Sequence, residues 1–212
     1  MLKSILQSCI PSAVFLRRLP TEFTNHVLLT FDDGPHPEAT PAILETLQQY
    51  NARAIFFVVG DRIDRAPELL KAINDQGHAL GNHSYSHPMR EPFRYRAYCD
   101  ELARCDAEIH RHVSAPVYYH RPPLGSISFA TAVAPRQQGL RTVLWSCSAE
   151  DWRFASDADA VTTANQLSQT LRPRDILLMH DEKLFTVTLL QHLLPALVER
   201  GLRFDVAVER KL

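Results

Sequence analysis

The chain has 212 residues, of which 45% are hydrophobic, and this is enough to build one domain, or one and a half, around a sizeable core. Lysine and arginine number 23 against 24 aspartate and glutamate, so no basic surface indicates nucleic acid or an anionic membrane as a partner. The four cysteines form no Cys-x-x-Cys pair and no compact framework, which argues against disulfides and against a thiolate zinc site. We therefore expect a small or neutral partner.

Residues 1–26 are expected to form an N-terminal extension. Apolar residues recur there at helical spacing: Ile5, Leu6, Cys9, Ile10, Ala13 and Val14. This spacing favours a capping helix, with an amphipathic helix on a membrane surface as the alternative. Polar residues interrupt the apolar run, so we infer no export signal, and no segment reaches the roughly 20 apolar residues of a transmembrane span. We accordingly expect a cytoplasmic protein.

A short apolar run at residues 27–31 predicts the first strand, covered on both faces. The run ends in Asp32 and Asp33, and the following Gly34 and Pro35 stop the strand. Because adjacent residues of an extended chain point in opposite directions, we expect the two carboxylates to hold different roles. The other interpretation is an ordinary turn, since Asp, Gly and Pro each favour turns.

Strands and helices then alternate along the chain. Apolar runs predict further strands over residues 54–59, 78–81, 117–119, 142–145, 176–179 and 204–208. Helical spacing and caps predict helices over residues 40–50, 67–73, 102–113, 129–138, 158–171 and 187–198. The alternation indicates an α/β fold, and about seven parallel strands favour a distorted, partly closed (β/α) barrel over a flat doubly wound sheet. Residues 27–212 are expected to form this catalytic domain.

Seven polar side chains fall just after predicted strands. They are Asp32, Asp33, His83, His87, Arg121, Asp151 and His180. In a (β/α) barrel the C-terminal ends of the strands form one rim, where catalytic residues gather. We therefore expect these side chains to meet at a single site.

Three of these residues form a candidate metal centre. Asp33, His83 and His87 supply a carboxylate and two imidazoles, which suit zinc, cobalt or iron(II) and leave room for water. Gly81 and Pro88 bracket the histidines, so we expect them on a loop or a single turn. The alternative is a pair of unconnected surface histidines.

The remaining residues suit acid–base chemistry beside a metal. A divalent metal lowers the pKa of bound water towards roughly 7, and a neighbouring base can then take a proton from that water. Asp32 is the candidate base, held by paired hydrogen bonds from Arg121. His180 is the candidate acid for the leaving group, and Asp151 would raise the pKa of His180 and fix its orientation. The alternatives are a fourth metal ligand for His180, a helix cap or solvated carboxylate for Asp151, and a surface arginine for Arg121.

Five segments, taken in order, resemble the motifs of the polysaccharide deacetylases, the NodB-homology family or carbohydrate esterase family four. They are residues 30–34 (TFDDG), 83–87 (HSYSH), 121–125 (RPPLG), 151–152 (DW) and 177–181 (LLMHD). The resemblance covers nearly the whole chain from residue 27. It implies a distorted (β/α) barrel and metal-dependent hydrolysis of N-acetyl groups on amino sugars, less often of O-acetyl groups on xylan.

The resemblance also implies a role for each matching residue. The base is Asp32, the acid is His180 and the metal ligands are Asp33, His83 and His87. Zinc is the first candidate for the metal, with cobalt, iron or nickel as the others.

Further residues take supporting roles by the same resemblance. Arg121 and Asp151 would tune the base and the acid. The backbone N–H of Leu124 would help to hold the oxyanion, and Trp152 and Leu178 would wall the acetyl pocket. An acetylated amino-sugar glycan is therefore the expected substrate. The alternatives are an O-acetyl esterase or amidohydrolase acting on a small or lipid-linked substrate, and a domain that binds glycans without cutting them.

Three positions depart from the family pattern. Leu124 stands where an aromatic residue is common, which we expect to alter sugar stacking but not the backbone donor. Ser148 stands where an additional acid often precedes the Asp-Trp pair, so we expect weaker support around Asp151. His120 often has an aromatic counterpart. None of these departures removes a catalytic atom.

Overall fold

The computed structural model describes residues 15–89, 94–206, 208 and 212. The apolar spacing that predicts a capping helix falls in residues 1–14, outside the described residues. Within the described part, no helix has the length and the apolar character needed to cross a membrane.

The described strands form one open, curled sheet of eight, in the order β1-β6-β5-β4-β3-β2-β8-β7, and all the paired neighbours run parallel. Their bounds are β1 (Phe15–Leu16), β2 (Leu28–Asp32), β3 (Ala54–Val58), β4 (Ala79–Asn82), β5 (Tyr119–His120), β6 (Arg141–Val143), β7 (Cys147–Ser148) and β8 (Ile176–His180). The curled sheet confirms the predicted α/β fold and its distorted, partly closed (β/α) barrel.

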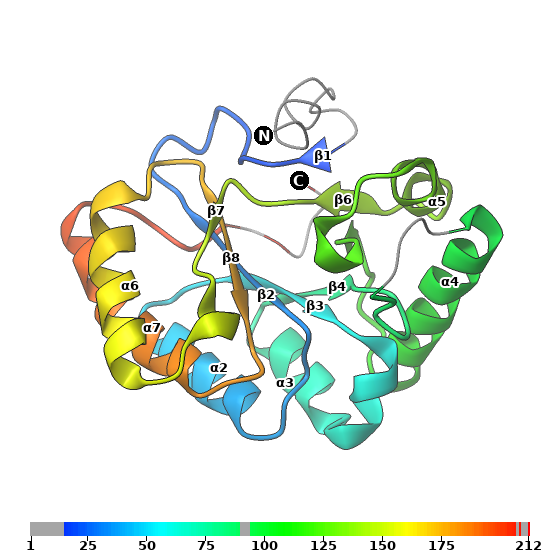
Figure 1. The fold of residues 1–212 in the computed structure, drawn as a ribbon, viewed down its shortest axis with the longest axis horizontal. Helices are drawn as coiled ribbons and strands as arrows, with labels where there is room; N and C mark the ends of the chain where they lie inside the picture. The colour runs from blue at the N-terminus through cyan, green and yellow to red at the C-terminus, as the bar shows by residue number, and fades with distance from the viewer. Residues whose placement is uncertain (1–14, 90–93, 207, 209–211) are drawn as a thin grey trace.

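Helices follow the strands and cover the outside of the curve. They are α2 (Ala39–Gln49), α3 (Glu68–Asp75), α4 (Tyr95–His112), α5 (Phe129–Gln137), α6 (Asp157–Thr170) and α7 (Phe185–Glu199). Short 3₁₀ turns lie at η1 (Gly60–Arg65), η2 (Pro123–Gly125) and η3 (Asp151–Arg153). Figure 1 shows α6 and α7, then α2 and α3, then α4, following one another around the sheet.

Strand β2 lies inside the sheet between β3 and β8, and its two faces belong to different parts of the core. Leu29 and Phe31 pack in the larger hydrophobic cluster together with residues of α2 and α7, while Leu28 packs in a second cluster with Ile55. Burying one such side chain contributes about 1.5–3 kcal/mol. Because side chains alternate along a strand, Asp32 projects on the face of Leu28, away from the helices. The apolar alternation therefore directs this carboxylate into the concave side of the sheet.

The first strand lies within the predicted N-terminal extension. Residues Phe15 and Leu16 pair with Thr142 and Val143 of β6 and form one edge of the sheet. A strand of two residues has no measurable periodicity, so the sequence pattern did not predict it. The sheet thus begins before residue 27.

The strand predicted over residues 204–208 is wrong for the described residues 204–206. The structure assigns no strand to residues 204–206. The carbonyl of Phe204 accepts the N–H of Arg53 at 2.7 Å, while Arg203 forms an isolated bridge to His26. The apolar side chains of Phe204 and Val206 are buried all the same, which explains their strand-like pattern.

Candidate active site

The C-terminal ends of the strands bring the predicted polar residues to one rim. Asp32 ends β2 and His180 ends β8, and the two residues are direct partners in the register of these strands. His83 and Arg121 follow β4 and β5 without a gap, and Asp151 opens η3, just after β7. Residues from the five motifs, up to 148 positions apart in the chain (Asp32 and His180), therefore share one side of the sheet.

The two adjacent carboxylates face the same site. Asp32 Oδ2 lies 3.7 Å and Asp33 Oδ1 lies 3.8 Å from Nε2 of His83. The expected opposite orientation is wrong, because the extended backbone ends at Asp32 and Asp33 adopts a φ of 77°. The guanidinium of Arg62 donates a hydrogen bond to the backbone carbonyl of Asp33 in this left-handed conformation.

Asp33, His83 and His87 form a compact group of potential metal ligands, with one ligand atom from each within 4.8 Å of the others. Asp33 Oδ1 lies 3.3 Å from Nε2 of His87, and it is buried without accepting a hydrogen bond. Such an orphaned carboxylate oxygen is rare in protein interiors and fits a bound cation. Burial opposes ionisation, but electrostatic interactions, including those with His83 and Arg62, lower the pKa of Asp33. The donor set therefore fits a divalent metal.

The histidines come from a tight loop, as predicted. Nδ1 of His83 forms a 2.7 Å hydrogen bond with the carbonyl of Arg121, which leaves Nε2 directed at the carboxylates. Ser84 and His87 adopt φ values of 66° and 45°, and the His87 N–H donates to Ser84 Oγ at 3.2 Å. Burial, followed by the nearby His83, lowers the pKa of His87 and favours the neutral imidazole that a metal needs.

Arg121 is fully buried and holds Asp32 through one hydrogen bond, from Nη1 to Oδ1 at 2.7 Å. The predicted paired hydrogen bonds are wrong, because Nε and Nη2 of the guanidinium donate to other acceptors. Nη1 also donates to Thr30 Oγ1 at 2.9 Å, while Nε and Nη2 donate to the carbonyls of Val143 and Leu144 at 3.0 Å and 3.2 Å. Arg121 therefore links Asp32 both to Val143 of β6 and to Thr30 of β2, the strand that contains Asp32.

His180 and Asp151 form a second pair on the rim. Nδ1 of His180 lies 2.8 Å from Asp151 Oδ1, and the His180 backbone N–H donates to Asp151 Oδ2 at 2.8 Å. The hydroxyl of Thr186 donates to the same Oδ2, also at 2.8 Å. Burial opposes protonation, but the hydrogen bond and the charge of Asp151 raise the pKa of His180 to about 9. Its free Nε2 lies 4.0 Å from Asp33 Oδ2, on the edge of the metal-ligand group.

Comparison with known proteins identifies the family. Residues 21–143 match the family model for polysaccharide deacetylase. The chain belongs to the polysaccharide deacetylase family. A peptidoglycan-N-acetylglucosamine deacetylase of Bacillus cereus is 34% identical over 182 residues, which cover 84% of this chain and 65% of the relative. The chain thus spans less than two thirds of that relative.

Two crystal structures share the fold over most of the chain. The Bc1960 peptidoglycan N-acetylglucosamine deacetylase is 29% identical with a TM-score of 0.82, and the match covers 95% of this chain and 92% of that one. A BA3943 mutant, described as a CE4 family pseudoenzyme with restored enzymatic activity, is 25% identical with a TM-score of 0.82 over 98% of this chain and 75% of that one. The predicted membership of the deacetylase family is confirmed, and the pseudoenzyme shows that membership alone does not establish activity.

The residues that the deacetylase resemblance assigns to substrate binding border the same rim. Leu124 is 55% exposed and adopts a left-handed φ of 59°, which is rare for a bulky residue. Trp152 is 44% exposed, and its ring packs edge-on against His180 at 5.2 Å. Leu178 is buried on β8, two residues before His180 and therefore on the same face of the sheet.

The other two departures from the deacetylase pattern have structural partners. Ser148 Oγ accepts the N–H of Glu150 at 3.2 Å, while Thr186 supplies the additional support to Asp151 described above. His120 is fully buried, with 2.7 Å between its Nε2 and the Tyr98 hydroxyl. Burial above all lowers the pKa of His120 well below its usual value, so it is a neutral structural group.

Three supporting residues of the site were not predicted from the sequence. Thr30 is the one polar residue before Asp32 in strand β2, a signal that could have been noticed, and it donates to the Leu177 carbonyl at 2.7 Å. Arg62 and Thr186 contact the site from η1 and α7. Their sequence neighbourhoods have no distinguishing pattern.

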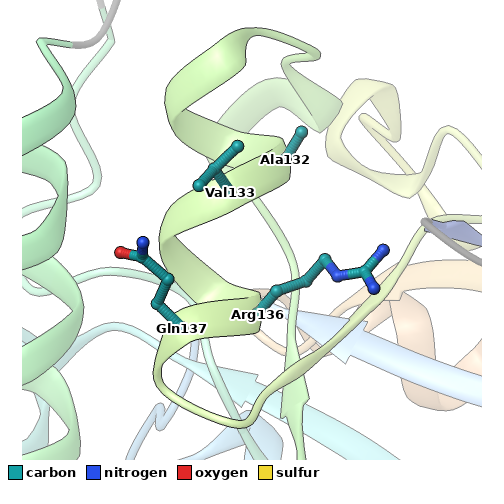
Figure 2. A pocket seen from close by; sticks show the side chains of 4 residues that line it. All are labelled: Ala132, Val133, Arg136 and Gln137. Atoms are coloured by element: carbon teal, nitrogen blue, oxygen red, sulfur yellow. The ribbon is translucent and has the colours of Figure 1, made fainter.

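A separate pocket of about 440 Å³ lies on α5, lined by Ala132, Val133, Arg136 and Gln137. Figure 2 shows these four side chains on the surface of one helix. They include no carboxylate, histidine or thiol. The pocket therefore offers none of the groups that hydrolysis requires, and the rim remains the candidate active site.

Proposed function

We propose that this chain is a metal-dependent hydrolase that removes N-acetyl groups from an amino-sugar glycan. The observation that carries the proposal is the arrangement of Asp33, His83 and His87 between two acid–base pairs, Asp32 with Arg121 and His180 with Asp151. The orphaned Oδ1 of Asp33 supports a cation at this point, and zinc is our first candidate because it favours mixed imidazole and carboxylate ligands.

Asp33, His83 and His87 would hold the metal, which when bound would activate water and polarise the acetyl carbonyl. Asp32 would serve as the proton acceptor at this point, because its Oδ2 faces the ligand group while Arg121 occupies Oδ1. The buried arginine keeps the Asp32 carboxylate oriented. This assigns Asp32 as the general base.

His180 completes the proposed reaction as general acid. Its Nδ1 is occupied by Asp151, and its pKa of about 9 keeps a proton on Nε2, ready for the leaving amine nitrogen. Nε2 of His180 lies outside the compact group of Asp33, His83 and His87, 4.0 Å from Asp33 Oδ2, which argues against the alternative of a fourth metal ligand. We assign the oxyanion to the backbone N–H of Leu124, whose unusual φ of 59° is the kind of strain that gathers at functional sites.

We propose an N-acetylglucosamine glycan as the substrate class, because the Bacillus cereus relative and the Bc1960 protein are both named peptidoglycan N-acetylglucosamine deacetylases. The presence of base, acid and ligand residues in one site favours hydrolysis over glycan binding alone. The cytoplasmic location stays a prediction, which fractionation of cells that express the full chain would test.

Acetate release from a panel of acetylated compounds tests the proposal. With zinc-loaded protein, we expect release from N-acetylglucosamine oligomers and peptidoglycan fragments and much slower release from acetylated xylan. Faster release from xylan or from non-sugar acyl compounds would favour the esterase or amidohydrolase alternative. Tight glycan binding without release would indicate a non-catalytic domain.

A further inference from the structure

We propose that Glu101 of α4 is a positioning residue for the histidine loop, residues 83–87, and sets the geometry in which His83 and His87 bind a metal. This inference rests on the proposed metal-dependent function. Glu101 lies outside all five family motifs, and its side-chain hydrogen bonds run to Tyr85 and Ser86 rather than to either histidine, so it would act through the backbone between them.

One carboxylate oxygen of Glu101 accepts hydrogen bonds from three donors in the middle of the histidine loop. Oε2 accepts the N–H of Tyr85 at 3.1 Å, the N–H of Ser86 at 2.7 Å and the hydroxyl of Ser86 at 2.9 Å. Hydrogen bonds to an ionised acceptor are stronger than neutral ones. Since Tyr85 and Ser86 lie between the two histidines, these bonds fix the segment that separates them.

The loop backbone needs such support. Ser84 and His87 both have positive φ values, 66° and 45°, in a region that non-glycine residues seldom occupy. Strained backbone of this kind persists only where the surrounding structure imposes it. His87 bonds to Ser84 within the loop, and Ser84 bonds to Asn82 at the end of β4. The N–H groups of Gly60 and Asp61 donate to the carbonyls of Ser84 and Tyr85, and Glu101 adds an anchor to the N–H groups of Tyr85 and Ser86.

Helix α4 offers a firm base for this anchor. Its Leu102 is fully buried, and the Leu102 carbonyl accepts a 2.8 Å hydrogen bond from Asn82, the last residue of β4. The guanidinium of Arg104 stacks over the Tyr85 ring at 3.8 Å from the centroid. Glu101, Leu102 and Arg104 therefore hold the end of β4 and the loop together along one turn of the helix.

The test compares Glu101→Ala and Glu101→Gln with Asp100→Asn, a control that removes the charge of the neighbouring exposed acid. Zinc affinity is measured by competition with a chromogenic chelator. Groups that orient metal ligands typically contribute 10–100-fold to metal affinity, so we expect Glu101→Ala to weaken zinc binding by about 10-fold or more. The glutamine oxygen can accept the same donors, so Glu101→Gln should recover much of the affinity, and the control should match the unaltered protein.

Amide hydrogen exchange in the metal-free proteins provides a second measurement that does not depend on zinc. We expect faster exchange at Tyr85 and Ser86 in Glu101→Ala than in the control, because both amides lose their acceptor. Ser86→Ala removes one of the three donors to Glu101 and leaves the helix unchanged. It should therefore weaken zinc binding less than Glu101→Ala does. It replaces Glu101→Ala in the test if Glu101→Ala does not fold.

Unchanged zinc affinity together with unchanged exchange at both amides in Glu101→Ala would overturn the inference. If Glu101→Ala is unfolded, unchanged zinc affinity in Ser86→Ala would overturn it. Failure of the unaltered protein to bind zinc would instead contradict the proposed function, and the two failures are therefore distinguishable.

Discussion

At the scale of single residues, the candidate site assigns neighbouring groups to different tasks by giving them different partners. Asp32 is bound by a buried guanidinium, whereas Asp33 Oδ1 has two imidazoles beside it and no hydrogen bond. The two carboxylates are adjacent in sequence and alike in chemistry. Their environments therefore distinguish a candidate base from a candidate ligand.

This division predicts separate defects. Asp32→Asn keeps the acceptor oxygen for Arg121 but removes the base, so we expect acetate release to fall by about 10²–10⁴-fold with zinc affinity retained. Asp33→Asn should instead weaken zinc binding. Parallel kinetic and zinc-binding measurements on both variants check this, and near-full activity in Asp32→Asn would refute the assigned base.

The pKa of His180 gives a prediction about pH. As a general acid, His180 must be protonated, so activity should be lost as pH rises through its pKa, which Asp151 raises to about 9. Asp151→Asn removes the negative charge that raises the pKa of His180. We therefore expect the alkaline limb of the kcat profile to move to lower pH. Profiles between pH 6 and pH 10 measure the shift, and an unmoved limb would contradict the role of Asp151.

At the scale of elements, strands β3 and β4 support the site from beneath. Phe57 and Gly81 are partners in the strand register, and the Phe57 ring lies 4.3 Å below the Arg121 guanidinium. A Cβ added at Gly81 would come within 2.4 Å of that buried ring. The absence of a side chain at Gly81 therefore leaves room for the Phe57 ring, which packs against the Arg121 guanidinium.

We accordingly expect Gly81→Ala to destabilise the protein by about 1–3 kcal/mol, the usual cost of overpacking a core. The displaced ring should also disturb Arg121 and lower acetate release in the fraction that remains folded. Urea unfolding, followed by activity at low urea, measures both effects. A midpoint equal to that of the unaltered protein would show that Phe57 moves aside at no cost.

At the scale of the whole molecule, the curled parallel sheet assembles the site from distant segments. Short, continuous apolar runs predicted β2 and β8, and the polar residues that follow these runs lie on one rim of the sheet. The edge strands β1 and β7 have two residues each, too few for a periodic signal. Supporting contacts such as Arg62 with Glu182, 120 positions apart, depend on the folded sheet and have no local signature.

The central claim is that Asp33, His83 and His87 hold a metal on which hydrolysis depends. The most direct test strips the protein of metal, refills it with zinc or cobalt, and measures bound metal and acetate release from N-acetylglucosamine oligomers in the same samples. We expect no release from stripped protein and recovery in proportion to metal, up to one ion per chain. Full activity in the stripped protein, or metal binding that Asp33→Ala leaves unchanged, would contradict the account.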